Sequence, residues 1–145
     1  MALDPHGLPV LNGIWQGSDM TLRRYAAESD AKGDRTLRET GSFTRFAPPR
    51  EAGRYETLIH AEAQLPAVGG RVICGTIRTD TADLGFVLAS HAEGSLFVAS
   101  FDFAKPFIGL EVHGGHILAE NASGEIWRFD ISDPLHITAG ILPGT

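Results

Sequence analysis

The feature that most constrains this chain is a series of short strand-like runs, separated by turn residues at hairpin intervals, within residues 71–131. Residues 71–78 and 85–90 are rich in β-branched and aromatic side chains, and turn-forming residues follow each run. In residues 95–103, apolar side chains recur with the period of two that places them on one face of a strand: Phe97, Ala99, Phe101 and Phe103. The opposite face of that segment is mixed. The pattern predicts an all-β protein with almost no helix.

The rest of the chain continues this pattern, with further strands expected at 10–25, 35–46, 55–64, 107–113, 116–121, 125–131 and 136–142. The first of them is expected to be one long strand, bent at Gly13 and Gly17. Gly114 and Gly115 form a two-residue hairpin signal. We therefore expect an irregular N-terminal arm at 1–9, a single β domain at 10–142 and a short tail at 143–145.

About nine or ten strands in one domain leave a sheet with two edges, and closing the sheet into a barrel removes both. Short turns between consecutive strands favour an up-and-down order. We therefore predict a single closed antiparallel barrel of about 8–10 strands, with a two-sheet sandwich as the alternative. Residues 86–106 resemble residues 116–134 in the order of their apolar, glycine and proline positions, so propeller-like blades are a further alternative. A chain of 145 residues is too short for four ordinary blades, and a propeller would need other chains.

The formal charge of -6, with acidic and basic residues interspersed, favours solubility and argues against a nucleic-acid partner. The first residues lack a basic start and an apolar stretch, and no apolar run is long enough to span a membrane. We therefore expect a cytoplasmic protein with no membrane partner. The single cysteine, Cys74, lies in an apolar run, where a small buried side chain is expected.

At Gly13-Ile14-Trp15 the chain resembles the calycin superfamily, the lipocalins and their bacterial relatives, which carry a Gly-x-Trp at the start of the first strand of a barrel. The resemblance implies a lipocalin-like barrel with an arginine, late in the chain, that packs over the tryptophan. Arg128, in the next-to-last expected strand, is the position that matches. Trp15 and Arg128 are then structural residues that close one end of the barrel. The chain departs from secreted lipocalins in lacking a leader and paired cysteines, which argues against extracellular transport.

A closed barrel of this size leaves a lumen that holds one small molecule. We therefore predict that the protein binds a small hydrophobic or amphipathic molecule in that lumen. The residues expected to form its wall and its polar anchors are chosen by alternation along the strands: Phe43, Arg45, Tyr55, Arg78, Phe86 and Phe97.

An enzyme built on the same barrel is the first alternative. His60 and Glu62 lie two residues apart and are expected on the same strand face, where the carboxylate would orient the imidazole for proton transfer. Together with His113 they are the acid/base candidates for an isomerase, cyclase or lyase. The phycobilin lyases, which are lipocalin-like, support this alternative by analogy of fold.

The densest cluster of metal-ligand residue types surrounds the Gly114-Gly115 turn: Glu111, His113, His116 and Glu120. Histidines in a hairpin loop are usually solvated, so we expect no metal and no cofactor. The second functional alternative is a structural or assembly module that completes a homo-oligomer or a propeller. The similarity between residues 86–106 and 116–134 favours this alternative.

Overall fold

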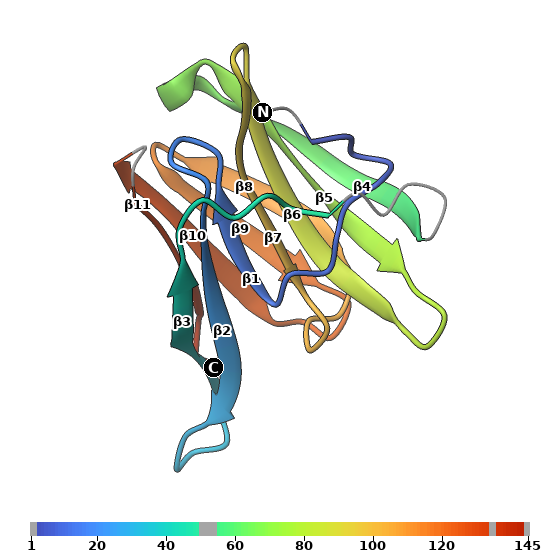
Figure 1. The fold of residues 1–145 in the computed structure, drawn as a ribbon. Helices are drawn as coiled ribbons and strands as arrows, with labels where there is room; N and C mark the ends of the chain where they lie inside the picture. Colours follow the sequence, from blue (N-terminus) through green and yellow to red (C-terminus); the bar gives the residue numbers. More distant parts are fainter. Residues whose placement is uncertain (1–2, 50–54, 134–135, 144–145) are drawn as a thin grey trace.

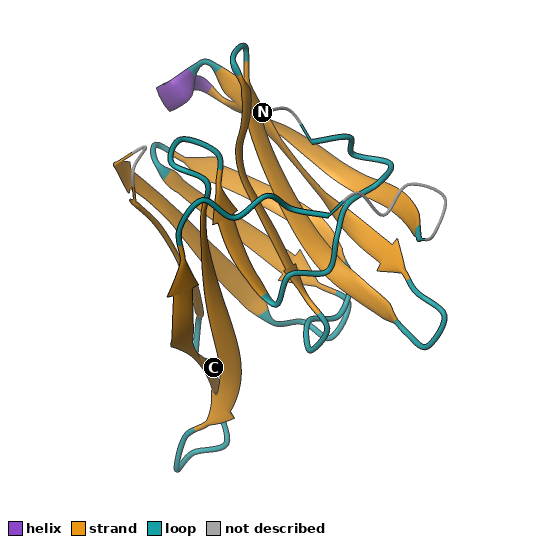
Figure 2. Ribbon diagram, in the orientation of Figure 1, coloured by secondary structure: helices purple, strands orange, loops and turns teal. Residues whose placement is uncertain are grey.

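A computed structural model describes residues 3–49, 55–133 and 136–143 of the chain. Most of these residues form strands, with one short 3-10 helix, η1 (Pro66–Val68) (Figures 1 and 2). The strands are β1 (Gly13–Gln16), β2 (Thr21–Ser29), β3 (Arg35–Phe43), β4 (Glu56–Leu65), β5 (Gly70–Arg78), β6 (Asp83–His91), β7 (Gly94–Phe101), β8 (Phe107–His113), β9 (His116–Asn121), β10 (Ile126–Asp133) and β11 (His136–Ile141). The prediction of an all-β protein is confirmed.

The strands form two sheets in which all pairs are antiparallel. The larger sheet has seven strands in the order β3-β2-β1-β7-β6-β5-β4, and the smaller has four in the order β11-β10-β9-β8. Most strands pair with their neighbours in sequence, as expected from short turns. The consecutive strands that do not pair are β3 with β4, at opposite edges of the larger sheet, and β7 with β8, in different sheets. Strand β1 pairs with both β2 and β7 and so joins two groups of hairpins into one sheet. Figure 1 shows the smaller sheet in orange to red.

The predicted closed barrel is wrong, because neither sheet closes on itself. The two sheets instead pack face to face, with one core of buried side chains drawn from both of them. This arrangement corresponds to the two-sheet sandwich, the alternative to the barrel. The lumen that the barrel implied is replaced by this core.

A small group of polar side chains fills one of the two margins at which the sheets approach each other; the other margin lies between β4 and β8. The last strand, β11, approaches β1 and β3 of the larger sheet. There the backbone N–H of Ile137 donates to Gln16 Oε1 at 2.8 Å, and Arg23 Nη1 donates to the carbonyl of Ile137 at 3.3 Å. Arg23 Nη1 also donates to Gln16 Oε1 at 2.5 Å. Side chains therefore occupy the backbone groups that a neighbouring strand would need.

The inner core, between the two sheets, is dominated by aromatic rings. Trp127 of β10 lies at its centre, with ring centroids 4.9 Å from Phe101 and 5.5 Å from Phe107. Phe97 and Phe129 stack across the two sheets at 5.8 Å. Residues of the inner core are fully buried, so close-packed side chains fill the space that would have been the lumen.

A second, outer core lies on the opposite face of the larger sheet. Its members are mainly aliphatic and come from the sheet and from the N-terminal arm: Leu8, Leu11, Trp15, Leu22, Ile73, Ile77, Leu84, Phe86, Leu88 and Val98. The arm, which in the structure extends over residues 3–12, forms no strand. Two serines of β7 hold it instead: Ser95 Oγ accepts from Leu3 N and Ser100 Oγ from Leu11 N, both at 2.8 Å. The central strands β6 and β7 are consequently buried on both faces, and Val98 and Ser100, from the mixed face of 95–103, lie against the outer core and the arm.

The expected single strand at 10–25 is two strands, β1 and β2, joined by a turn and paired with each other. The two glycines expected to bend the strand allow close approach of neighbouring backbones. A Cβ atom on Gly13 would lie 2.1 Å from the carbonyl oxygen of Arg23, and one on Gly17 would lie 2.0 Å from that of Ser95. Both positions therefore exclude any side chain.

Within the described part of the chain, no helix has the length and apolar character needed to cross a membrane.

Candidate ligand-binding cleft

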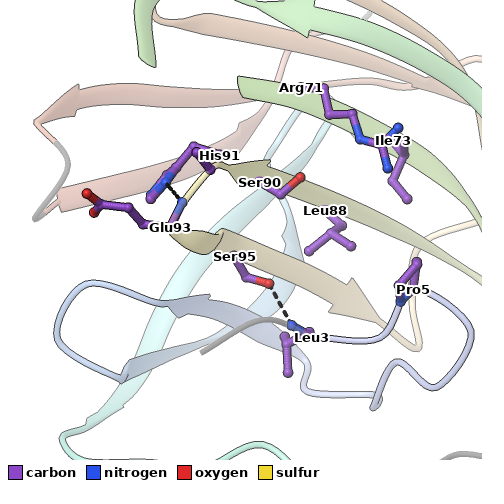
Figure 3. A pocket seen from close by; sticks show the side chains of 11 residues that line it. Leu3, Pro5, Arg71, Ile73, Leu88, Ser90, His91, Glu93 and Ser95 are labelled. Atoms are coloured by element: carbon purple, nitrogen blue, oxygen red, sulfur yellow. Dashed lines mark hydrogen bonds between the residues drawn. The ribbon is translucent and has the colours of Figure 1, made fainter. Parts of the chain in front are cut away.

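A cleft of about 350 Å³ opens on the outer side of the larger sheet, where the β6–β7 hairpin meets the N-terminal arm (Figure 3). Its floor comes from β5 and β6, its rim from the hairpin turn, and one wall from the arm. The residues that line it are Leu3, Pro5, Arg71, Ile73, Leu88, Ser90, His91, Ala92, Glu93, Gly94 and Ser95.

Strand register places a polar pair beside an apolar pair on the floor of the cleft. Arg71 of β5 is directly opposite Ser90 of β6, and Ile73 is directly opposite Leu88. Residues two apart on a strand share a face, so the two pairs are adjacent. The surrounding outer core leaves Ile73 only 5% exposed and Leu88 only 4% exposed. The cleft is therefore amphipathic along its length.

The polar end of the cleft keeps donors that can bind a ligand. Arg71 donates from Nη1 to Glu62 Oε1 at 2.9 Å, and both side chains are about half exposed, at 55% and 47%. An exposed ion pair of this kind contributes about 0–1 kcal/mol, so an anionic ligand can compete with Glu62. The hydroxyl of Ser90 makes no hydrogen bond within the described residues. A carboxylate or phosphate oxygen between Arg71 and Ser90 would gain donors from both.

His91 at the rim has a defined tautomer when neutral. Its Nδ1 accepts a hydrogen bond from the backbone N–H of Glu93 at 3.0 Å, as Figure 3 shows. The proton of the neutral ring is therefore on Nε2, which is left as a further donor.

The arm wall is positioned by the hydrogen bond from Leu3 N to Ser95 Oγ (Figure 3). Leu3 and Pro5 then face the apolar part of the floor. A ligand that contacts the floor would consequently also contact the arm.

A larger hollow of about 490 Å³ lies between the β2–β3 and β9–β10 turns, but its arginine is already bound. Arg35 Nη1 donates to both carboxylate oxygens of Glu125, at 3.2 and 3.1 Å, and Nη2 donates to the carbonyl of Phe103 at 2.8 Å. This guanidinium has few donors left for a ligand. The cleft at Arg71 is therefore the stronger candidate.

The structure separates the acid/base candidates His60 and Glu62. A bulge in β4, between Ile59 and Ala61, alters the alternation at His60. The His60 ring forms a hydrogen bond with Thr76 Oγ1 at 2.7 Å, whereas Glu62 accepts one from Arg71. Thr76 and Arg71 lie on opposite faces of β5. The carboxylate therefore does not orient this imidazole. His113 lies at the far hairpin, exposed and 3.6 Å from Glu111.

The six residues expected to line a lumen are dispersed over the molecule. Phe97 belongs to the inner core and Phe86 to the outer core, on opposite sides of the larger sheet. Phe43 is 48% exposed beneath the guanidinium of Arg24, and Arg78 pairs with Glu56 and Asp83, both at 3.3 Å. Arg45 is exposed, and Tyr55 packs at the margin of the outer core. No shared cavity brings the six together among the described residues.

The two residues that the calycin resemblance paired are far apart. Trp15 is buried in the outer core, where its indole N–H donates to the carbonyl of Phe46 at 2.9 Å. Arg128 lies on the outer face of the smaller sheet and donates from Nε to Asp130 Oδ1 at 2.8 Å. Arg128 does not pack over this tryptophan.

His116, Arg128 and Asp130 form an ion-pair cluster on that outer face. His116 Nδ1 is 2.5 Å from Asp130 Oδ1, and Arg128 Nη2 is 3.1 Å from His116 Nδ1. Partial burial acts to raise the pKa of Asp130, but hydrogen bonds from Arg128 and His116 outweigh it and hold that pKa below its usual range. Of the four expected metal ligands, His116 belongs to this cluster, Glu111 and His113 form a separate exposed pair, and Glu120 has no partner among the described residues. No group of three His, Cys, Asp or Glu residues within the described ranges is arranged to hold a metal ion.

Cys74 is buried in the inner core, with Sγ 3.5 Å from the carbonyl oxygen of Phe107. Burial raises the pKa of its thiol to about 11, so at neutral pH the group is protonated and unreactive.

The cleft residues escaped prediction because the cleft forms only when the arm docks on the sheet. His91 and Glu93 look like solvated turn residues in the sequence, and Ser90 has no motif around it. The available signal was the alternation of Arg71 with Ile73, which places a charge next to an apolar side chain on one face. Recognising it required the register of β5 against β6.

Comparison with known proteins identifies no relative: no family model, no curated protein and no solved structure matches this chain. The class that the structure defines is an all-β protein built from two antiparallel sheets, with a cleft beside its N-terminal arm.

Proposed function

We propose that the protein binds a small amphipathic molecule with an anionic head group in the cleft at Arg71. The observation that carries the proposal is the polar pair Arg71–Ser90 directly beside the apolar pair Ile73–Leu88. The anionic head would lie at the guanidinium, where a charge-assisted hydrogen bond is strongest. The apolar part would lie over Ile73 and Leu88, beneath Leu3 and Pro5.

The size of the cleft limits the ligand. A volume of about 350 Å³ is near the lower end of the range for small-molecule sites. A short-chain carboxylate or phosphate ester fits this space better than a long lipid. The calycin resemblance and the cytoplasmic location stay predictions, and the resemblance contributes only the class of ligand, a small hydrophobic or amphipathic molecule.

The enzymatic alternative has less support. Neither His60 nor His113 lines the cleft, and the pair of His60 with Glu62 on which it depended is separated by the bulge in β4. Binding is therefore the function that the geometry favours.

A calorimetric titration with a series of straight-chain carboxylates, butanoate, hexanoate and octanoate, tests the proposal. Each added methylene that reaches the apolar floor should strengthen binding by about 0.8 kcal/mol, close to fourfold. The alkyl amine of the same length should bind much more weakly, because Arg71 repels it. Equal binding of the amine would contradict the proposal.

A matched pair of variants on β5 locates the site. Arg71→Gln should weaken hexanoate binding by about tenfold, which corresponds to the loss of one charge-assisted contact. Arg78→Gln is the control, because Arg78 lies on the same strand, is similarly exposed at 51% and is absent from the cleft. If both variants bound hexanoate alike, the carboxylate would not lie at Arg71.

A further inference from the structure

The outer face of the smaller sheet is open to solvent, unlike the outer face of the larger sheet, which the arm covers. Register places three rows of side chains on this face across β8, β9 and β10. One row contains Gly109, Glu120 and Ile126, and the next contains Glu111, Leu118 and Arg128. Glu111 and Glu120 are both exposed, and Leu118 is half-buried between them.

Exposed apolar side chains gather at one end of this sheet. Ile108, Ile126 and Leu142 are 52%, 39% and 38% exposed. Leu142 lies beside Ile126, because its backbone N–H donates to the carbonyl of Ile126 at 2.9 Å. They are three of the five large apolar side chains exposed in the described ranges. Adjacent exposed apolar side chains, such as Ile126 and Leu142, mark an interaction surface more often than isolated ones do.

A groove of about 300 Å³ borders this apolar region at Ile126, and its other lining residues are Gly109, Leu110, Glu111, Leu118 and Glu120. Gly109 creates part of the hollow. A Cβ atom placed there would touch only Glu120 Cβ, at 3.9 Å, and Gly109 has no positive φ that would require glycine. The groove is thus an open space over the strand.

The charge of the groove is acidic and largely uncompensated. Glu120 has no partner among the residues that the structure describes, and Glu111 has only the exposed ring of His113 at 3.6 Å. Arg128, the nearest cation in the same rows, is bound to Asp130 at 2.8 Å. The whole chain carries a formal charge of -6, which adds to the attraction for a cation.

We propose that this groove docks an extended segment of a partner protein in which lysine residues alternate with aliphatic residues. The stem of a lysine would pack on Leu118, and its ammonium group would lie between Glu111 and Glu120, as long cationic side chains do on apolar surfaces. The aliphatic residues of the segment would cover Ile126 and Leu142. The segment would thus cover the exposed apolar side chains and neutralise the two glutamates at the same time.

The test uses a blocked Lys-Leu-Lys-Val-Lys peptide as probe, titrated into the 15N-labelled full chain and followed by NMR. The amides of Gly109, Leu118 and Ile126 should shift, and the Glu-Leu-Glu-Val-Glu peptide should shift none of them. Gly109→Val should weaken binding at least about tenfold by filling the groove. Gly41→Val is the matched control, because it adds the same side chain on β3 of the larger sheet, where an added Cβ meets only the ring of Phe43, at 3.5 Å.

Charge is tested separately. Glu120→Gln should weaken the basic peptide by about two- to fivefold, the range for one exposed ion pair, and added salt should remove the difference. Equal loss in both glycine variants, or equal binding of the acidic peptide, would overturn the proposal. Self-association of the chain that Gly109→Val abolishes would also overturn it, since the occupant would then be a second copy.

Discussion

The two tryptophans lie on opposite sides of the larger sheet, Trp127 in the inner core and Trp15 in the outer core, and show how different these cores are. Trp127 is surrounded by rings, with centroids of Phe101, Phe107 and Phe129 at 4.9, 5.5 and 6.5 Å. Trp15 lies among aliphatic side chains, with its indole N–H bound to the carbonyl of Phe46 at 2.9 Å. Both side chains are fully buried.

The two cores differ more in the segments that cover them than in the side chains that they contain. Hydrogen-bonded strands cover the inner core on both sides, whereas the outer core is covered by segments without strands: the arm, held by serine side chains, and the segment around Phe46. Opening the inner core therefore requires separating the sheets, whereas opening the outer core requires release of the arm and of the segment around Phe46, neither of which is a strand. This difference explains why the cleft is found beside the arm.

The largest expected effect is that of Trp127→Ala, which removes the central ring of the inner core. Unfolding should become easier by about 3–5 kcal/mol, because several aromatic neighbours lose their packing partner at once. Urea denaturation followed by far-UV circular dichroism measures this change. Trp127→Phe, which keeps a ring, should cost much less, and equal costs would show that ring packing does not stabilise this core.

Leu8→Ala is the corresponding change in the outer core. Its expected cost is about 2–3 kcal/mol, at the low end for a buried leucine, because the arm can relax around the cavity. Limited proteolysis should cut the variant in the arm before the sheets unfold. Simultaneous loss of all amide protection in hydrogen exchange would show instead that the arm and the sheets unfold together.

Ser100→Ala tests the attachment of the arm. Ser100 Oγ accepts from Leu11 N and donates to the carbonyl of Pro9, both at 2.8 Å, and both backbone groups would lose their partner. The expected cost is about 1–2 kcal/mol in urea denaturation. Ser42→Ala, at an exposed position on β3, is the control and should cost almost nothing.

The smallest effect concerns the ion-pair cluster on the smaller sheet. Because the pKa of Asp130 is lowered in the folded protein, its contribution to stability is present above the ordinary aspartate pKa of about 3.9 and is lost as the pH falls below it. The carboxylate is partly exposed, so the contribution should stay below about 1 kcal/mol. Stability measured from pH 6 to pH 3 should fall less steeply in Asp130→Asn. Parallel curves would show that the cluster adds nothing.

Local pattern was enough to place most strands. The segments expected at 107–113 and 116–121 are β8 and β9, joined at Gly114-Gly115 as the hairpin signal predicted. The alternation of Phe97, Ala99, Phe101 and Phe103 correctly placed these side chains on one face, which lies against the inner core. These features depend on neighbours in sequence, which periodicity reports directly.

Closure of the sheet was not predictable, because it depends on contacts between residues more than a hundred positions apart. Gln16 and Ile137 meet only in the folded protein, and neither position signals that a side chain rather than a strand will bind there. The cleft has the same character. Arg71, Ser90 and Leu3 come together through register and through docking of the arm, and alternation alone fixes neither.

The hydrogen bonds of Gln16 and Arg23 to β11 also bear on solubility at high concentration. Exposed edges of sheets recruit further strands, and such edge-to-edge growth is a route to fibrils. At Ile137 both backbone groups on the outer side of β11 are already occupied, by an amide and a guanidinium. At that residue β11 therefore cannot pair with a strand of another molecule, although the sheets do not close into a barrel.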